Sequence, residues 1–273
     1  MDDVFEKFSL RGRVAIVTGG AGLLGQEFCR TLAQAGARMV VADVNAQAAT
    51  SVAGQLARDG LAAVPLATDI TDPESVRRLI EGSLDAFGRL DILVNSAAVD
   101  PKFDDSQVGQ HGSRFEDYPL TAWKQAVDVN LTGMFLCSQA AVRHMLAEKR
   151  GSIVNICSTY GLVGPDQRIY RIPGKPAQYK PVVYSVTKAG VLGLTRYLST
   201  YCGEQGVRIN ALTPGGVHNA HDEHFVANYS ARTVLGRMAR RDEMNGALLF
   251  LASDASSYMT GANLVVDGGW TAW

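Results

Sequence analysis

Short apolar runs alternate along the chain with longer segments in which apolar residues recur at helical spacing. In "LGQEFCRTLAQAG", Leu24, Phe28 and Leu32 recur every four residues, and Gly36 provides a stop signal. The apolar runs are "VAIV" at 14, "MVVAD" at 39, "AAVPLATD" at 62, "DILVN" at 91, "SIVNIC" at 152, "VRINAL" at 207 and "NLVVD" at 263. Runs without apolar/polar alternation are typical of strands covered on both faces. The pattern predicts an α/β fold, in which a single doubly wound domain, 1–273, holds a seven-stranded parallel sheet with helices on both faces.

Three segments have the composition of loops: 100–119, 164–181 and 216–230. Each follows the carboxyl end of a predicted strand, which is the edge where open α/β sheets bind ligands. Long loops at this edge are commonly binding elements. We therefore predict that these three segments contact the substrate.

The composition excludes several classes of partner. The 273 residues are 47% hydrophobic and carry a formal net charge of −1, so nothing indicates binding to nucleic acid or to an anionic membrane. No apolar run is long enough to span a bilayer, and the N-terminus lacks a secretory signal. The four cysteines are far apart and form no C-x-x-C pair, which favours a reduced, cytoplasmic protein over a disulfide scaffold or a zinc site.

A glycine-rich turn, "TGGAGLLG", directly follows the first predicted strand and begins a helix. Glycines at such a place let backbone N–H groups approach a pyrophosphate that lies on the positive end of the helix dipole. The turn therefore predicts dinucleotide binding. Its candidate contact residues are Gly19, Gly22, Leu23, Leu24 and Gly25.

Asp43, followed by Val44, ends the second strand about twenty residues after the turn, where a carboxylate can accept hydrogen bonds from the adenosine ribose. The same charge would repel a 2′-phosphate, and no Arg or Lys stands in the turn or directly after Asp43. These residues favour NAD over NADP. Alternatively, Asp43 only caps the helix that follows it.

With these motifs the chain resembles the short-chain dehydrogenase/reductase family, a Rossmann-like fold, from about Leu10 to its C-terminus. The family's Thr-Gly-x-x-x-Gly-x-Gly turn has Leu23 at its middle glycine, and this spacing is similar to that of extended sugar-nucleotide epimerases. The resemblance implies further cofactor contacts. They are Asp69 and Ile70 of "TDI", Asn95 and Ala97 of "NSAA", and Pro214, Gly215 and Val217 after the sixth strand.

Tyr184 and Lys188 are spaced four apart, which places them one turn apart on one helix face. An ammonium at about 4 Å is worth up to roughly 4 kcal/mol at an effective dielectric near 20. It could bring the Tyr184 pKa from about 10 toward about 7, although desolvation raises the pKa and reduces this shift. Tyr184 could then exchange a proton with a substrate hydroxyl while the nicotinamide takes the hydride.

The resemblance implies a role for each remaining catalytic candidate. Ser158, at the end of a strand, would hydrogen-bond the reacting oxygen, and Lys188 would both tune Tyr184 and hold the nicotinamide ribose. Asn130, in "DVNLTG", matches a helix Asn that anchors a water in the proton relay. The alternative for Asn130 is a side chain that bonds its own backbone.

His218, His221 and His224 recur every three residues. Such a set spreads over too wide an arc of a helix to converge on one ion, and hydride transfer assisted by a Tyr and a Ser needs no Lewis acid. We therefore predict no metal.

Ser158 and Tyr184 are 26 positions apart, about twice the usual family spacing, so segment 164–181 is an insertion between two catalytic candidates. Its basic residues Arg168 and Arg171 predict that it recognises a polar, negatively charged substrate over the active site. Alternatively, the insertion is a solvated loop or a subunit contact. The insertion and the C-terminal "VVDGGWTAW" are similar to dehydrogenases associated with flagellin-modifying sugars.

The sequence therefore predicts an NAD(H)-dependent oxidoreductase that transfers a hydride between nicotinamide and a secondary alcohol or ketone of a sugar or an anionic sugar derivative. Alternatives are a 3-oxoacyl-thioester reductase, a sugar epimerase or dehydratase, and a non-catalytic NAD-sensing module. Trp270 and Trp273 are costly to leave in water, and members of the family commonly form tetramers, so we expect both at a subunit contact of a homotetramer.

Overall fold

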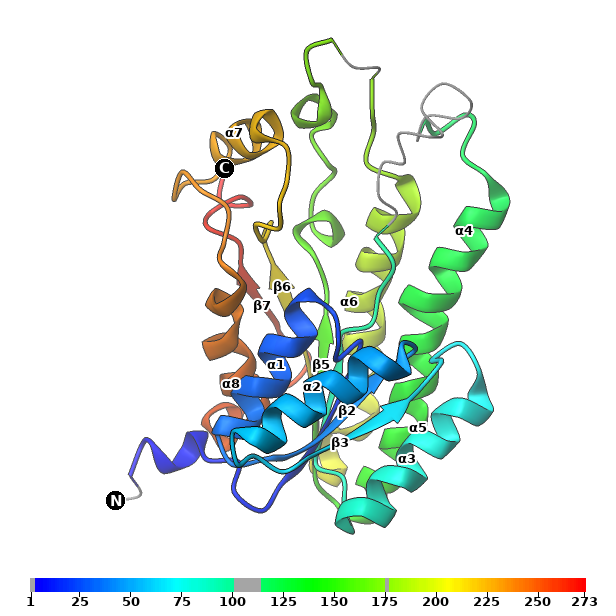
Figure 1. Cartoon of the computed structure of the whole chain (residues 1–273), viewed down its shortest axis with the longest axis vertical. Helices are drawn as coiled ribbons and strands as arrows, with labels where there is room; N and C mark the ends of the chain where they lie inside the picture. The colour runs from blue at the N-terminus through cyan, green and yellow to red at the C-terminus, as the bar shows by residue number, and fades with distance from the viewer. Residues whose placement is uncertain (1–2, 101–113, 175–176) are drawn as a thin grey trace.

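A computed structural model describes residues 3–100, 114–174 and 177–273. Seven parallel strands form one sheet with the order β3-β2-β1-β4-β5-β6-β7 (Figure 1). The strands are β1 Val14–Thr18, β2 Arg38–Asp43, β3 Ala63–Ala67, β4 Ile92–Asn95, β5 Gly151–Ile156, β6 Val207–Pro214 and β7 Asn263–Val266. The predicted parallel α/β sheet is confirmed.

Helices cover both faces of the sheet. The α-helices are α1 Leu23–Gln34, α2 Ala46–Arg58, α3 Pro73–Phe87, α4 Leu120–Val127, α5 Met134–Ala147, α6 Val182–Cys202, α7 Glu223–Ser230 and α8 Asn245–Ala252. In β1, Ala15 and Val17 pack in one core with α1, α2 and α8, whereas Val14 and Ile16 pack in another with α3 and α5. Successive strand residues thus enter opposite apolar cores, which is why the sequence runs show no polar alternation.

Shorter turns of helix connect these elements. They are the 3-10 helices η1 Glu6–Phe8, η4 Thr159–Gly161, η5 Gln167–Tyr170, η6 Gly203–Gln205, η7 Arg241–Met244 and η8 Asp254–Ser256, and the π-helical turn η3 Asp128–Gly133. All four cysteines are buried and have free thiols. Within the ranges the structure describes, no helix combines the length and apolarity needed to cross a membrane.

The order of the strands fixes where a ligand can bind. Strands β2 and β3 are added to one side of β1, and β4 to β7 are added to its other side. The strand order therefore reverses between the neighbours β1 and β4, although all strands are parallel. At such a reversal, the loops leaving the carboxyl ends of adjacent strands diverge and leave a crevice. Figure 1 shows α7 and the segment that precedes α6 at this same end of the sheet.

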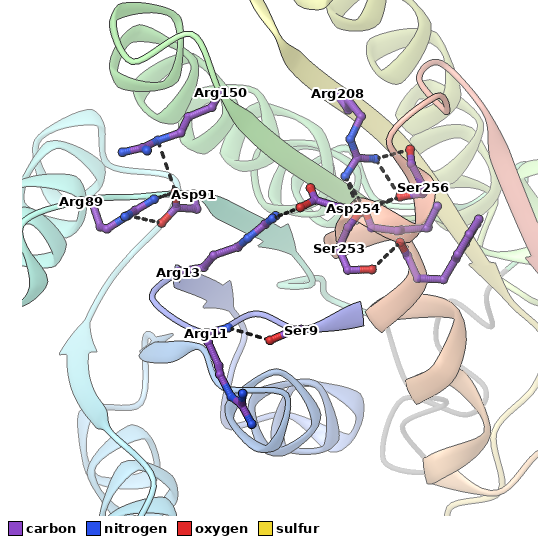
Figure 2. Close-up of polar contacts among 12 residues, drawn as sticks. Ser9, Arg11, Arg13, Arg89, Asp91, Arg150, Arg208, Ser253, Asp254 and Ser256 are labelled. Atoms are coloured by element: carbon purple, nitrogen blue, oxygen red, sulfur yellow. Dashed lines mark hydrogen bonds and ion pairs between the residues drawn. The ribbon is translucent and has the colours of Figure 1, made fainter. Parts of the chain in front are cut away.

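A polar network closes the opposite end of the sheet (Figure 2). Arg208 of β6 donates to the carbonyl oxygens of Ser253 and Ser256, which follow α8, at 2.9 and 3.0 Å. The Asp91 side chain is only 6% exposed; it pairs with Arg89 at 2.6 Å and accepts a hydrogen bond from the Val14 backbone N–H at 2.9 Å. These contacts link the amino ends of β1, β4 and β6 to the rest of the fold.

We predict that Asp91→Ala lowers the free energy of unfolding by about 3 kcal/mol, because it leaves a buried N–H and an arginine without their acceptor. Urea denaturation followed by circular dichroism measures the change. Asp59→Ala is the matched control, since Asp59 is 46% exposed and pairs with Arg30 at 3.5 Å; its expected effect is below about 0.5 kcal/mol. Equal effects of the two substitutions would contradict the assigned role of Asp91.

Candidate active site

A cavity of about 1490 Å³ opens at the carboxyl end of the sheet. Its walls come from the loops after β1, β2, β3, β4, β5 and β6, from the insertion and from α7. Most of the residues predicted from the sequence line it. They are Gly19, Gly22, Leu23, Leu24, Gly25, Asp43, Val44, Asp69, Ile70, Ala97, Ser158, Tyr184, Lys188, Pro214, Gly215 and Val217.

The glycine-rich turn brings three backbone segments into close contact. Gly19 has φ +64°, and a Cβ there would lie 2.7 Å from Ala97 Cα, while a Cβ on Gly25 would lie 2.0 Å from the Gly19 carbonyl oxygen. Gly22 is the N-cap of α1, so Leu23, which takes the place of the usual middle glycine, is the first residue of the helix. The first N–H groups of an α-helix have no acceptor within it. Backbone donors at the cavity wall therefore fit the pyrophosphate of a dinucleotide.

Asp43 lies between the glycine-rich turn and α2. One carboxylate oxygen accepts from Ala21 N–H and the other from Asn45 N–H, each at 3.0 Å. The cap of α2 is Asn45, whose side chain accepts from Ala48 N–H at 3.0 Å. The interpretation of Asp43 as a helix cap is therefore wrong, and its carboxylate is held at the cavity wall where an adenosine ribose would lie.

Asp69 and Ile70, the two residues predicted to contact the adenine, have polar and apolar surroundings respectively. The Asp69 carboxylate accepts from the hydroxyl and the backbone N–H of Thr71, and these hydrogen bonds hold the pKa of Asp69 below its usual value. Ile70 is buried against Gly133. Both line the cavity.

Asn95 lies beneath the cavity and does not line it. Its side-chain amide is 2% exposed and donates to Ser138 Oγ at 3.0 Å and to Asn155 Oδ1 at 2.8 Å. It therefore ties β4 to β5 and α5. The segment after β4 reaches the cavity through Ala97 and Val99 instead.

Ser158, Tyr184 and Lys188 come together at the end of β5. Ser158 caps η4 by accepting from Tyr160 N–H at 3.2 Å, and it forms a side-chain hydrogen bond with Tyr184. Lys188 is one turn beyond Tyr184 on α6. Its ammonium donates to the Ile156 carbonyl oxygen at 2.9 Å and lies 5.8 Å from the centroid of the Tyr184 ring.

The electrostatics of this pair differ from the sequence prediction. Burial raises the pKa of Tyr184, the nearby charge of Asp100 raises it further, and the hydrogen bond with Ser158 opposes them. Desolvation lowers the pKa of Lys188 to about 8. The expectation of an acidified phenol is wrong, because desolvation outweighs the effect of an ammonium that donates to a carbonyl oxygen and lies 5.8 Å from the centroid of the ring.

Asn130 occupies η3, between α4 and α5. Its amide accepts from Val99 N–H at 2.8 Å and donates to the Val99 carbonyl at 3.0 Å and to Thr187 Oγ1 at 3.2 Å. The alternative that Asn130 bonds its own backbone is therefore wrong. Asn130 does not line the cavity; it links the cavity-lining Val99 to α6, and its place in a proton relay stays a prediction.

An aromatic wall, which the sequence prediction did not include, lines one side of the cavity. It consists of Tyr160, Tyr170, Phe225 and Tyr229, with Met238 beside them. The Tyr170 hydroxyl donates to the Tyr160 hydroxyl at 2.9 Å, and the Tyr170 and Phe225 rings are 5.5 Å apart. The spacing of Phe225 and Tyr229, four residues apart in a predicted binding loop, was the available signal.

Arg168 and Arg171 are exposed and do not line the cavity. Arg168 pairs with Asp166 at 2.8 Å, and Arg232 binds the same carboxylate. Among the described residues of the insertion, the basic side chain in the cavity wall is Lys180. Two parts of the predicted substrate loops lie outside the described residues. They are 101–113 in loop 100–119, and Lys175 and Pro176 in the insertion.

Trp270 is buried within its own chain and is 4% exposed. Its ring stacks on Tyr229 with centroids 4.2 Å apart, and Arg232 lies 5.4 Å from it. The prediction that Trp270 needs a subunit contact to leave water is therefore wrong. Trp273 is 76% exposed, and its indole N–H donates to the Arg232 carbonyl at 3.2 Å.

The turn after β6 is tightly packed. A Cβ on Gly215 would lie 2.7 Å from Asp267 Cα, and Gly216 N–H donates to the Tyr229 hydroxyl at 2.6 Å. Beyond it, the His221 ring packs against Phe225 at 5.1 Å. The described part of the chain contains no group of three His, Cys, Asp or Glu side chains placed to hold a metal ion.

The fold and this site define a dinucleotide-binding α/β protein, and its relatives narrow the class. A family model described as enoyl-(acyl carrier protein) reductase matches residues 20–271. Cis-4-hydroxycyclohexanecarboxylate dehydrogenase of Sinomonas cyclohexanicum is 38% identical over 265 residues, which cover 95% of this chain and 97% of that protein.

Two solved structures are also similar to this chain over almost its whole length. A short-chain type dehydrogenase/reductase from Mycobacterium marinum has a TM-score of 0.85 and 31% identity, with 98% of this chain and 99% of that chain covered. A gluconate 5-dehydrogenase from Burkholderia cenocepacia in complex with NADP and tartrate has a TM-score of 0.87 and 31% identity, with 99% and 100% covered. The chain belongs to the short-chain dehydrogenase/reductase family.

We predict that the contribution of Lys188 to the free energy of unfolding rises between pH 8 and 10, opposite in sign to that of the buried thiols of Cys29 and Cys137, whose pKa values burial raises. Below its folded pKa of about 8 the ammonium is charged in both states and the burial penalty is complete. Between about 8 and the ordinary value of 10.5, the Lys188 side chain binds fewer protons in the folded protein than in the unfolded chain, so its contribution to stability increases with pH. Loss of this penalty is worth about 2 to 3 kcal/mol.

Chemical denaturation of wild type, Lys188→Met and Lys7→Met at pH 7 to 10 measures the effect. The stability of wild type relative to Lys188→Met should rise across this range, whereas its stability relative to Lys7→Met should stay constant, since Lys7 is exposed on η1. An identical pH dependence in all three proteins would show that Lys188 is not the responsible group.

Proposed function

We propose that this protein is an NAD(H)-dependent oxidoreductase that interconverts a secondary alcohol and a ketone, with a sugar or an anionic sugar derivative as substrate. The observation that carries the proposal is the convergence of Ser158, Tyr184 and Lys188 in one wall of the cavity. The same cavity extends to the glycine-rich turn and Asp43, whose backbone donors and carboxylate suit a dinucleotide.

The protein's own residues would manage the proton and the orientation of the substrate. Ser158 would donate a hydrogen bond to the reacting oxygen, and the Tyr184 phenol would give that oxygen a proton in reduction or take one in oxidation. A bound nicotinamide supplies or accepts the hydride. With a pKa near 8, Lys188 can gain or lose a proton near neutral pH, and its ammonium form stabilises a phenolate at Tyr184.

The aromatic wall supports a ring or a carbon chain with an apolar face as part of the substrate. Rings of Tyr160, Tyr170 and Phe225 present flat apolar faces, while hydroxyls at their edges can bond polar groups. This mixture suits a carbohydrate or a hydroxylated carbocycle. The relatives that act on cis-4-hydroxycyclohexanecarboxylate and on gluconate are consistent with such a substrate.

We predict that Tyr184→Phe lowers kcat by at least about 100-fold with little change in NADH affinity, because it removes the proton donor. Absorbance of reduced nicotinamide measures turnover with gluconate, cis-4-hydroxycyclohexanecarboxylate, neutral polyols and an acetoacetyl thioester. Tyr258→Phe, at a fully exposed side chain, is the matched control. Binding of NADH without turnover in wild type would favour an NAD-sensing module, and turnover of the thioester alone would favour the 3-oxoacyl-thioester reductase.

The choice of NAD over NADP rests on Asp43. Its carboxylate is fixed by two backbone N–H groups, and the residues from Asp43 to Ala46 that begin α2 include no Arg or Lys. A 2′-phosphate would meet a like charge with no basic partner there. The gluconate 5-dehydrogenase from Burkholderia cenocepacia holds NADP, so the choice needs a direct test.

We predict that wild type prefers NAD over NADP in kcat/KM and that Asp43→Asn reduces this preference by roughly tenfold or more, since it removes the repelling charge. Steady-state kinetics with both cofactors measures the ratio. Asp59→Asn, at the exposed end of α2, should leave the ratio unchanged. A wild-type preference for NADP would contradict the proposed cofactor.

We also propose a homotetramer in the cytoplasm. Trp270 is buried within its own chain and gives no support for a subunit contact. An exposed aromatic cluster supports the assembly instead, formed by Phe135 on α5 and by Tyr197 and Tyr201 on α6. An exposed aromatic cluster of this kind is typical of a protein contact surface. The similarity to dehydrogenases of flagellin-modifying sugars also stays a prediction.

A further inference from the structure

Lys180 lies in the cavity wall directly before α6. Its ammonium is 4.1 Å from the centroid of the Tyr184 ring and 6.0 Å from that of Tyr160. Its side chain is 11% exposed, and its backbone N–H donates to Gln167 Oε1 at 2.8 Å. The insertion thus fixes a cation beside the residue that we propose as the acid/base.

The partner of this cation is a half-exposed carboxylate. Lys180 pairs with Asp100 at 2.5 Å, and the Asp100 side chain is 54% exposed and also lines the cavity. A half-exposed carboxylate regains hydration when it leaves an ion pair, so its exchange for another anion costs little. The nearly buried ammonium, by contrast, needs an anionic partner whenever Asp100 is displaced.

Three other cations near the insertion are engaged elsewhere, and Arg171 is exposed and does not line the cavity. Arg168 and Arg232 both bind Asp166, whose side chain is 14% exposed and does not line the cavity. Lys188 binds the Ile156 carbonyl oxygen beneath Tyr184. Lys180 therefore differs from them in combining a place in the wall, contact with the Tyr184 ring and an exchangeable partner.

We propose that Lys180 is the specificity-determining residue of the site, and that it binds a carboxylate of the substrate, which displaces Asp100. The substrate is then a hydroxy acid or keto acid whose reacting carbon lies a short distance from the carboxylate. A carboxylate replaces Asp100 charge for charge, whereas a phosphate dianion would leave one negative charge unbalanced. This inference rests on the proposed function, because it assumes that the reacting group lies at Tyr184.

Binding to the full chain saturated with NADH tests the assignment independently of turnover. Isothermal titration calorimetry compares cyclohexanecarboxylate with its neutral counterpart of similar shape, cyclohexanecarboxamide, and with cyclohexyl phosphate. We expect wild type to prefer the carboxylate over the amide by about 10- to 100-fold, the range for a hydrogen bond to a charged group. Lys180→Met should abolish this preference, and Asp100→Asn should increase it because the internal competitor is neutralised. Lys7→Met is the matched control and should change neither affinity.

Several results would overturn the assignment. They are equal binding or no binding of carboxylate and amide by wild type, a preference that survives in Lys180→Met, and tighter binding of the phosphate than of the carboxylate. A shifted pH profile of turnover in Lys180→Met with an unchanged carboxylate preference would instead make Lys180 a tuning residue of Tyr184 and would also overturn it. A carboxylate preference that depends on Lys180 in a protein with no turnover would support the anion site while contradicting the proposed oxidoreductase.

Discussion

The contact between α6 and the turn after β5 fixes the position of every group proposed to do chemistry. The Lys188 ammonium binds the Ile156 carbonyl, Cys157 Sγ donates to the Lys188 carbonyl at 3.1 Å, and a Cβ on Gly161 would lie 2.7 Å from that same carbonyl group. Backbone and side chain of Lys188 are thus held by the residues that flank Ser158. Because Tyr184 lies one turn earlier on the same helix, this clamp also determines the position of its phenol relative to Ser158.

The clamp has an electrostatic consequence. Partial burial of Tyr184 and full burial of Lys188 disfavour the charged form of both, so the phenol is a weaker acid and the ammonium a stronger acid than in water. Tyr184 is therefore neutral, which is the form that would donate a proton in ketone reduction. Alcohol oxidation needs the phenolate, whose formation depends on positive charge near Tyr184. Two ammonium groups, Lys188 and Lys180, are placed to provide it.

The sequence predicted those parts of the fold and site that depend on local pattern. Apolar runs located the strands because the residues of the central strands enter a core on one face or the other, and "TGGAGLLG" located the turn because the backbone there leaves no room for side chains at Gly19 and Gly25. The aromatic wall was missed because it depends on contacts between segments more than 50 residues apart, such as Tyr170 with Phe225. Asn95 was misplaced for a similar reason, since its position at a strand end does not reveal that its amide turns toward Asn155.

The insertion shows that counting its charges does not reveal which of its basic side chains line the cavity. Its exposed arginine Arg168 shares Asp166 with Arg232, which follows α7, so these charges attach the insertion to the neighbouring substrate loop. That attachment brings Tyr170 against Phe225 and thereby builds one wall of the cavity. Lys180, the cation that lines the cavity among the described residues of the insertion, is adjacent to Pro181, the N-cap of α6, where the insertion rejoins the clamped helix. Its position beside Tyr184 therefore depends on the same helix that the contact with the turn after β5 holds in place.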